Sequence, residues 1–268
     1  MKKKFKLGVI GAGFMATSII KGAINSKTIS PEEIIVSDIN ESSLEKISLL
    51  GVSTTIDNVE IANSSEFVLF AIKPQESTKV LQTIQNSSCK KFISIMAGVK
   101  KDKIKSFIND SMVARCMPNT PCSINSGAIG IDYSDFTEEN DIDFIKDVFS
   151  SLGVALFVEE KNLGAVTGVS GSAPAYFYLF LDGIIKAGIK CGLDEKTAKS
   201  LATATMIGAG KMVEANSDKP LEDLINAVCS KGGTTIQAVN VYKENNLENI
   251  TLDAINACVK RSEELENI

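Results

Sequence analysis

The chain has 268 residues, of which 44% are hydrophobic and 23% charged, a composition typical of soluble globular proteins that bury a sizeable core. Its net charge of −5 argues against nucleic acid as the main partner, because binding to phosphates needs a basic face. The absence of histidine excludes the Ser-His-Asp and Cys-His nucleophile systems and Cys/His zinc sites, so no metal site is expected.

The N-terminal sequence resembles a secretory signal only superficially. A basic head precedes apolar residues in MKKKFKLGVIGAGFMATSII, but three glycines interrupt the apolar part and no small-x-small cleavage site follows. No apolar run approaches the roughly 20 residues that cross a bilayer. The six cysteines form no Cys-x-x-Cys pair and are most simply small buried side chains. We therefore expect a cytoplasmic protein without membrane association.

The first half of the chain alternates short apolar runs with helical patterns. The apolar runs predict strands at 6–11, 33–38, 67–72, 91–96, 112–117, 127–133 and 154–159. Apolar residues at helical spacing predict helices at 15–26, 42–50, 102–109 and near 139–152, with a further helix after Lys73-Pro74. Strands that are apolar on both faces predict a mainly parallel, Rossmann-like sheet that is covered on both sides. Its ligands are expected beyond the carboxyl ends of the strands.

After about Glu160 the strand-like runs stop and only helical patterns remain. These patterns predict one helix that starts at Ser172 and another that Asp194 caps, followed by helices at 221–229, 234–244 and 251–266. We therefore predict two domains, an α/β domain over 1–159 and an all-α domain over 160–268.

A dinucleotide fingerprint, G-x-G-x-x-A, occupies residues 11–16. Gly11 makes the tight turn, Gly13 leaves room for a pyrophosphate, and Ala16 lets the helix pack closely on the strand. The start of the helix then offers free N–H groups and a positive dipole end to the phosphates. Because the fingerprint follows a strand and opens a helix, it favours dinucleotide binding over a tight turn of another α/β protein.

The type of dinucleotide depends on the end of the second strand. Asp38 closes this strand, where an acidic side chain usually holds the ribose 2′-OH of NAD. No arginine lies nearby to hold the 2′-phosphate of NADP, although Ser37 is placed to help. The sequence therefore favours NAD(H) and leaves NADP(H) open, and the alternative for Asp38 is an ordinary loop residue.

Two segments of the second half of the chain, VTGVSGSAPAYFYLF (166–180) and AVCSKGGTTIQAVNVYKEN (227–245), are long and specific. Together they resemble the two signatures of the family of pyrroline-5-carboxylate reductases. Segments AIKP (71–74) and RCMPNTP (115–121) are similar to N-domain segments of the same family. The resemblance covers essentially the whole chain. It implies reduction of Δ1-pyrroline-5-carboxylate to L-proline by NAD(P)H, the last step of proline synthesis. It also implies that residues 160–268 form a substrate-binding and dimerisation domain, whose homodimers can assemble into a decamer.

The resemblance also implies a set of site residues. Cofactor contacts fall on Gly11, Ala12, Gly13, Phe14, Met15, Asn58, Ala71, Ile72, Lys73, Pro74, Met96, Ala97, Gly98 and Glu160. The substrate loop falls on Ser230, Gly233, Thr234 and Thr235, and the Thr235 hydroxyl is the implied catalytic partner of the imine nitrogen. Spacing alone explains Thr234 and Thr235 equally well as helix N-caps. The family's loop usually reads Ser-Pro-Gly-Gly, whereas Lys231 here replaces the proline, which either loosens the turn or adds a cation near the substrate carboxylate.

Imine reduction is possible without histidine, because the cofactor supplies the hydride and the substrate nitrogen can carry its own proton. Thr235 then needs only to orient the nitrogen, while backbone N–H groups at a helix start bind the carboxylate. One alternative is another small-substrate imine or keto-acid reductase. A β-hydroxyacid enzyme would use a catalytic lysine early in the first long helix after the boundary, and Lys186, the candidate, sits far past the helix start. The other alternative is a non-catalytic module that senses the dinucleotide without turnover.

Overall fold

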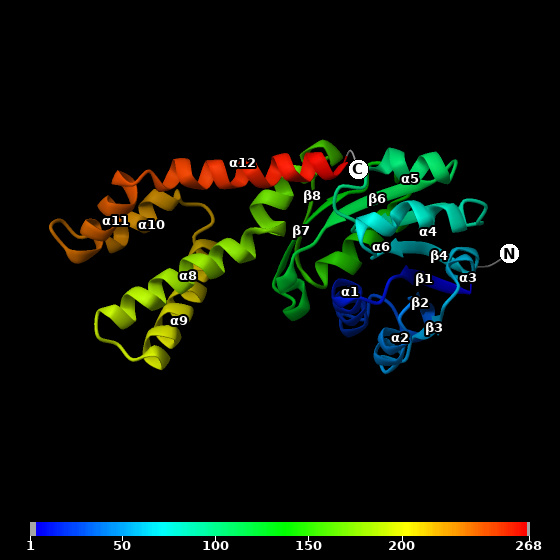
Figure 1. The fold of residues 1–268 in the computed structure, drawn as a ribbon, viewed down its shortest axis with the longest axis horizontal. Helices are drawn as coiled ribbons and strands as arrows, with labels where there is room; N and C mark the ends of the chain where they lie inside the picture. The colour runs from blue at the N-terminus through cyan, green and yellow to red at the C-terminus, as the bar shows by residue number, and fades with distance from the viewer. Residues whose placement is uncertain (1–3, 267–268) are drawn as a thin grey trace. The chain divides into compact units, whose positions relative to one another are not determined.

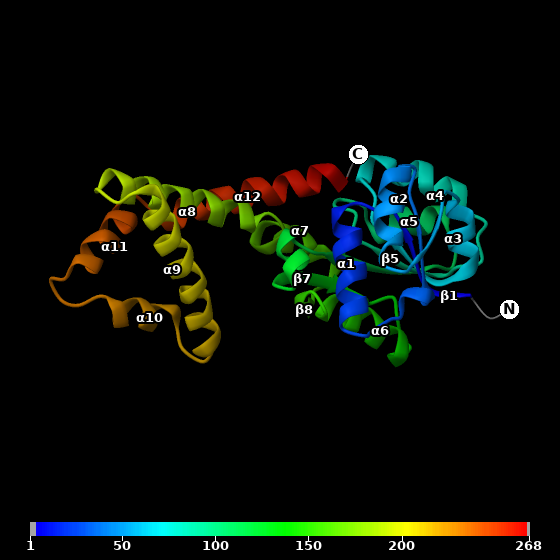
Figure 2. The same cartoon turned by 90° about the horizontal axis from the view of Figure 1, so that it is seen from below.

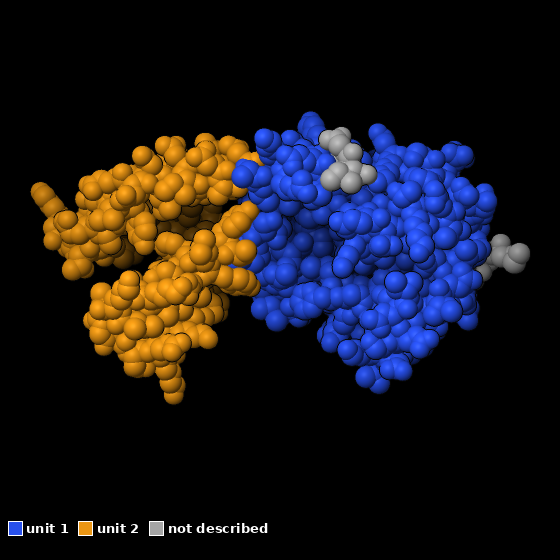
Figure 3. Space-filling view, in the orientation of Figure 1, with its two compact units in different colours: residues 1–174, 257–268 blue, residues 175–256 orange. Residues whose placement is uncertain are grey.

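The computed structural model describes residues 4–266, and the chain folds into two compact units. Unit 1 contains residues 1–174 and 257–268, and unit 2 contains residues 175–256 (Figure 3). The division after residue 159 stays a prediction, and it falls shortly after the last described strand, which ends at Phe157. The units themselves divide inside two helices, the one that starts at Ala173 and the one that ends at Glu266.

Unit 1 is built on one sheet whose strands in the described residues follow the order β3-β2-β1-β4-β5-β6-β7-β8 (Figure 1). The strands are β1 Phe5–Ile10, β2 Ile34–Ser37, β3 Ser53–Thr55, β4 Ser65–Phe70, β5 Lys91–Ser94, β6 Met112–Met117, β7 Gly127–Asp132 and β8 Gly153–Phe157. All neighbouring pairs are parallel except β6 and β7. The prediction of a mainly parallel sheet is confirmed, although the sequence patterns did not predict β3.

Helices cover both faces of this sheet (Figure 1 and Figure 2). Successive residues of a strand point to opposite faces, so each buried strand contributes to two cores. Val9 of β1 belongs to the core with α1 Phe14–Asn25, α2 Glu41–Ser48 and α6 Glu139–Ser150. Its neighbour Ile10 belongs to the opposite core with α3 Asn58–Ser64, α4 Ser77–Ile84 and α5 Lys101–Phe107. Each fully buried aliphatic side chain contributes about 1.5–3 kcal/mol, so the unit is stabilised from both sides.

Unit 2 is entirely helical in the described residues. Its elements are most of α8 Ala173–Lys190, α9 Glu195–Ala215, α10 Leu221–Val228, α11 Thr234–Glu244 and the first half of α12 Leu247–Glu266. Asp194 caps α9 as predicted, since its carboxylate accepts the N–H of Thr197 at 3.0 Å. A short helix, α7 Leu163–Val166, and a π-helical turn at Thr167–Gly171 precede α8 in unit 1. Of the described helices, none has both the length and the apolar composition for a membrane crossing.

The helices of unit 2 bury very little of their apolar surface within the chain. Of the described residues 175–256, only Ala198 is buried. The ring pair of Phe180 and Tyr242, with centroids 5.9 Å apart, joins α8 to α11. Large apolar side chains are exposed along all of these helices, among them Phe177, Leu179, Leu201, Met212, Leu221, Val228, Val241 and Leu252. Unit 2 therefore presents an apolar surface that a partner can cover.

Candidate functional site

The glycine turn between β1 and α1 has the shape that a dinucleotide needs. Gly11 has a φ of +104°, and a Cβ there would lie 2.6 Å from the carbonyl oxygen of Ala71, so only glycine fits. A Cβ on Gly13, by contrast, would meet nothing within 4 Å. Gly13 is also the N-cap of α1 and provides no side-chain cap. The turn thus combines open space with uncapped N–H groups at the start of a 12-residue helix, and these features fit a pyrophosphate.

Asp38 lies directly beside this turn. Its Oδ2 accepts the backbone N–H of Ala12 at 2.7 Å, and its Oδ1 accepts the N–H of Asn40 at 2.8 Å. The neighbouring Ser37 is buried at the end of β2, and its hydroxyl donates to Asn58 Oδ1 at 2.7 Å. A negative charge therefore stands next to the glycine turn, while the Ser37 hydroxyl already has an acceptor.

The loops that follow β4 and β5 lie at the same edge of the sheet. The N–H of Ala71 donates to Ile10 O at 2.9 Å, and the N–H of Ile95 donates to Phe70 O at 3.1 Å. Since β3, β2, β1, β4 and β5 are adjacent and parallel, their carboxyl ends bring many of the predicted cofactor residues together. These residues are Gly11, Ala12, Gly13, Phe14, Met15, Ser37, Asp38, Asn58, Ala71, Ile72, Lys73, Pro74, Met96, Ala97 and Gly98.

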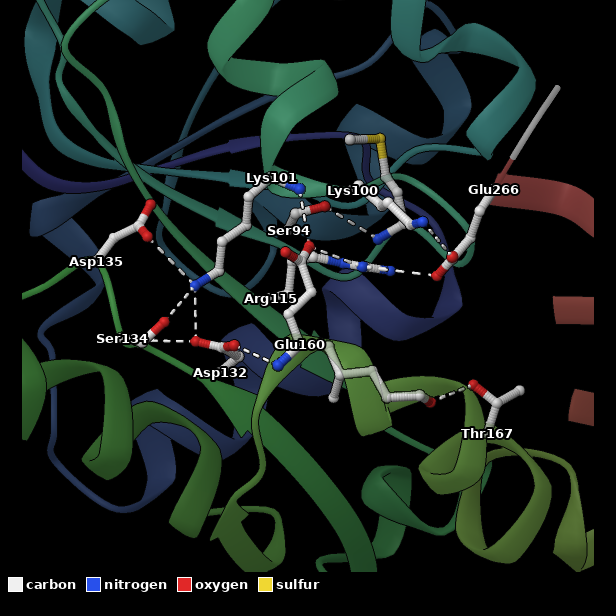
Figure 4. A network of polar contacts seen from close by, with 12 residues as sticks. Ser94, Lys100, Lys101, Arg115, Asp132, Ser134, Asp135, Glu160, Thr167 and Glu266 are labelled. Atoms are coloured by element: carbon white, nitrogen blue, oxygen red, sulfur yellow. Dashed lines mark hydrogen bonds and ion pairs between the residues drawn. The ribbon is translucent and has the colours of Figure 1, made fainter. Parts of the chain in front are cut away.

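Glu160, the remaining predicted cofactor residue, is the first residue of the 3-10 turn η4 Glu160–Asn162, which follows β8. Its Oε1 accepts Nη1 of Arg115 at 2.9 Å and the backbone N–H of Lys101 at 2.8 Å (Figure 4). Glu266, near the end of α12, also approaches Arg115, with Nη1 and Oε1 3.8 Å apart. Arg115 is only 3% exposed, so the two carboxylates balance a buried charge. A contact between Glu160 and the cofactor stays a prediction.

A second buried ion pair adjoins the first. Nζ of Lys101 lies 2.6 Å from Asp132 Oδ1 and 2.9 Å from Ser134 Oγ, and both charged side chains are almost completely buried. Asp132 Oδ2 accepts the backbone N–H of Glu160. Burial acts to raise the pKa of Asp132, but hydrogen bonds from Lys101 and Ser134 outweigh it, and the pKa lies below its ordinary value. Asp132 therefore stays ionised and connects β7 to α5 and to η4.

The predicted substrate loop lies in unit 2, between α10 and α11. The N–H of Gly233 donates to Ser230 O at 3.0 Å and closes a four-residue turn, in which Gly232 has a φ of +71°. Gly233 is the N-cap of α11 and this end has no side-chain cap, so Thr234 and Thr235 are the first two helical residues. The helix therefore starts without using either threonine as its N-cap.

Lys231 is exposed at the second position of this turn, just before Gly232. Proline is favoured at this position because its ring presets φ. The turn forms here without proline, since Gly232 provides the left-handed conformation and the Ser230–Gly233 hydrogen bond closes it.

Two family models match the chain. The model described as pyrroline-5-carboxylate reductase dimerisation matches residues 160–265, and the model described as NADP oxidoreductase, coenzyme F420-dependent, matches residues 6–98. A pyrroline-5-carboxylate reductase of Haemophilus influenzae is 38% identical over 266 residues, which cover 98% of each chain. The chain belongs to the pyrroline-5-carboxylate reductase family. A pyrroline-5-carboxylate reductase of Pisum sativum is 32% identical over 267 residues, 99% of this chain and 97% of the relative.

Solved structures of pyrroline-5-carboxylate reductases have the same fold. The enzyme of Coxiella burnetii has a TM-score of 0.90 at 30% identity, over 98% of this chain and 99% of the other. The enzyme of Plasmodium falciparum, solved with NADP bound, has a TM-score of 0.86 at 27% identity, over 99% and 100% of the two chains. A prephenate dehydrogenase at 13% identity, with a TM-score of 0.54, is similar in fold alone.

The sequence patterns did not predict the ionic cluster around Arg115. Its members are Lys100, Lys101, Arg115, Asp132, Ser134, Asp135, Glu160 and Glu266. A signal for it was present, because Arg115 stands inside an otherwise apolar strand and Asp132 closes another. A charge in a buried strand requires a buried partner, although spacing does not tell which residue that partner is.

Proposed function

We propose that this chain reduces Δ1-pyrroline-5-carboxylate to L-proline with a nicotinamide dinucleotide, the last step of proline biosynthesis, in the cytoplasm. The observation that carries the proposal is similarity to pyrroline-5-carboxylate reductases along the whole chain, from the glycine turn to the last helix. The fit of the glycine turn to a pyrophosphate supports it independently, because that fit rests on the geometry of Gly11 and Gly13.

Several loops of unit 1 would hold the dinucleotide. Residues 11–15 would bind the pyrophosphate through backbone N–H groups at the start of α1. Ser37, Asp38 and Asn58 would face the adenosine ribose. Residues 71–74 and 96–98, with Glu160, would contact the nicotinamide half. When bound, the reduced nicotinamide supplies the hydride for the carbon of the substrate's C=N bond.

The substrate would bind at the start of α11. The backbone N–H of Thr234, at the uncapped start of the helix, and the Ser230 hydroxyl provide donors for its carboxylate, and the positive end of the helix dipole favours the same charge. The Thr235 hydroxyl would orient the ring nitrogen. The nitrogen of the iminium form already carries its proton, so the chain needs no strong acid.

A second proposal concerns the choice between NADH and NADPH. A 2′-phosphate beside the glycine turn would meet the carboxylate of Asp38, which like-charge repulsion disfavours. The Ser37 hydroxyl, the nearest alternative donor, already donates to Asn58. We therefore propose that NADH is preferred to NADPH, although the Plasmodium falciparum relative was solved with NADP.

We further propose a homodimer that pairs through the helical unit and is able to assemble into a decamer. The exposed apolar side chains of α8–α12 and the match of 160–265 to a dimerisation model support this assembly. At the edge of the sheet, β8 also exposes Val154 and Leu156, and such an edge is normally covered. Light scattering on the purified protein will give the number of copies.

A turnover assay tests the activity. The purified protein is incubated with Δ1-pyrroline-5-carboxylate and either NADH or NADPH, while cofactor oxidation and L-proline are measured together. We expect one proline for each cofactor oxidised. Oxidation with a keto acid but not with pyrroline-5-carboxylate would instead identify a different reductase, and binding without oxidation would identify a sensing module.

A further inference from the structure

The loop that follows β5 rests on the C-terminal turn of α12, and both belong to unit 1. Gly98 has a φ of +73°, and a Cβ there would lie 3.0 Å from both the carbonyl carbon and the Cβ of Leu265. There is consequently little room for any side chain between this loop and the helix. The hydrogen bond from Val99 N–H to Met96 O, 3.3 Å long, closes the loop around the contact.

An ion pair at Lys100 binds the same loop to the end of α12. Lys100 Nζ lies 2.9 Å from Glu266 Oε2, while the other oxygen of Glu266 faces the buried guanidinium of Arg115 at 3.8 Å. The hydrogen bond to Glu266 raises the pKa of Lys100 above its ordinary value. Glu266 is thus placed between an exposed lysine of the loop and a buried arginine of β6.

The far end of the loop is bound through Glu160. This carboxylate accepts both the backbone N–H of Lys101 and Nη1 of Arg115, so Arg115 is shared by Glu160 and Glu266 (Figure 4). Residues 98–101 are therefore held at three successive points, by contact with Leu265, by Glu266 and by Glu160.

These contacts converge on the loop that the proposed function assigns to the nicotinamide half of the cofactor. An ion pair whose lysine is exposed, such as Lys100–Glu266, stabilises a fold only weakly, so stability alone does not account for its place here. The position of a hydride donor matters far more, because a shift of about 1 Å in a reacting group costs about 100-fold in rate.

We propose that Leu265 and Glu266 are positioning residues, which fix the 96–98 loop and thereby the nicotinamide that it contacts. Neither residue touches the reacting atoms, and both act through Gly98, Lys100 and Arg115. The proposal rests on the proposed function, because it needs a dinucleotide at this loop.

The test compares Glu266→Gln, which removes the charge and keeps the shape, with Glu264→Gln as a matched control. Glu264 lies on the same helical turn but is exposed and pairs with Arg261 at 2.8 Å. We expect Glu266→Gln to raise the KM for the dinucleotide and lower kcat, each by about 3- to 10-fold, with the KM for pyrroline-5-carboxylate unchanged. Glu264→Gln should match the wild type. Equal kinetics of the two variants, or a rise in both KM values together, would overturn the proposal.

Hydrogen exchange provides a readout that does not need turnover. Amides of residues 96–101 should exchange about 3- to 10-fold faster in Glu266→Gln than in Glu264→Gln, whereas amides of β5 should be unchanged. Dinucleotide affinity measured by calorimetry should fall in the same variant. If the wild type binds the dinucleotide but reduces no pyrroline-5-carboxylate, the proposed function fails, while these two measurements still decide whether Glu266 positions the loop. Equal exchange and equal affinity in both variants would refute the positioning role.

Discussion

Oδ2 of Asp38 lies 2.7 Å from the backbone nitrogen of Ala12, across the gap between the ends of β2 and β1. The same side chain that is expected to distinguish the two dinucleotides thus also holds the glycine turn in place. Asp38 therefore has two roles that substitution can separate, because asparagine keeps a hydrogen-bond acceptor and loses the charge.

Asp38→Asn should shift the preference toward NADPH. Removal of the charge relieves repulsion of a 2′-phosphate, and we expect the ratio of kcat/KM for NADPH to that for NADH to rise roughly 10-fold, equivalent to about 1.4 kcal/mol. Steady-state kinetics with both cofactors measure this ratio. Asp57→Asn is the control, since Asp57 caps α3 through Val59 N–H and should leave the ratio unchanged. A ratio that does not move in Asp38→Asn would contradict the assignment.

Thr235→Ala should lower kcat/KM for pyrroline-5-carboxylate by roughly 2- to 10-fold, the value of one neutral hydrogen bond. The affinity for NADH and the unfolding midpoint should not change, because Gly233 rather than Thr235 is the N-cap of α11. Thr235→Ser keeps the hydroxyl and should keep most of the activity. Unchanged kinetics in Thr235→Ala would exclude the proposed role of this hydroxyl.

Lys231→Pro should stabilise the protein by about 0.4–1 kcal/mol. Proline at this position of the turn restricts the unfolded chain while Gly232 still provides the positive φ. Urea unfolding measures the change, and a loss of stability would show that Lys231 has a backbone conformation that proline cannot adopt. Lys231→Ala tests the other explanation of this residue, that the lysine adds a cation near the substrate carboxylate. We expect an unchanged KM for pyrroline-5-carboxylate, and a rise would mean that the lysine binds the substrate carboxylate.

Asp132→Asn should destabilise the protein by about 3 kcal/mol at neutral pH, because it leaves the buried Lys101 without its closest charge partner. The pKa of Asp132 is lowered in the folded state, so its stabilisation is fully present above the ordinary value of 3.8 and is lost as the pH falls through the folded pKa. The difference in free energy of unfolding between wild type and variant should therefore be constant above about pH 5 and shrink below pH 3.8.

Urea titrations at several pH values measure this difference, with Asp143→Asn as the control. Asp143 is exposed, and its Oδ1 lies 4.0 Å from Lys146 Nζ, so its replacement should change stability by less than about 0.5 kcal/mol. A difference between wild type and Asp132→Asn that grows toward low pH would have the wrong sign for a lowered pKa.

Most of the sheet and its helices followed from local patterns. Long apolar runs such as β4 and the spacing within α1 report burial directly, so both were predicted close to their observed bounds. Strand β3 and helix α3 were missed, since they have only 3 and 7 residues and few apolar side chains. The start of α12 was placed at Thr251, one turn after Leu247, because that first turn lacks a strong apolar stripe.

The candidate site was predictable where its residues are neighbours in sequence. The glycine turn is set by glycine conformations within a few residues, whereas the loop before α11 was assigned only through the family resemblance and its role stays a prediction. The partners of Arg115 were not predictable, because Glu160 and Glu266 reach it only after the sheet has formed and the last helix has returned to unit 1. The hydrogen bond between Asp38 and Ala12 depends on the same long-range packing.

The nearly coreless helices of unit 2 have a consequence for how this protein responds to dilution. With Ala198 alone buried among the described residues 175–256, these helices gain little from folding as a single copy. If a second copy covers them, mass action couples their folding to association, and their melting temperature should rise with protein concentration. Unit 1, with its own two-sided core, should melt at a temperature that depends much less on protein concentration. Unfolding of unit 2 would then be coupled to dissociation of the copies, whereas unfolding of unit 1 would remain mainly a reaction within one chain.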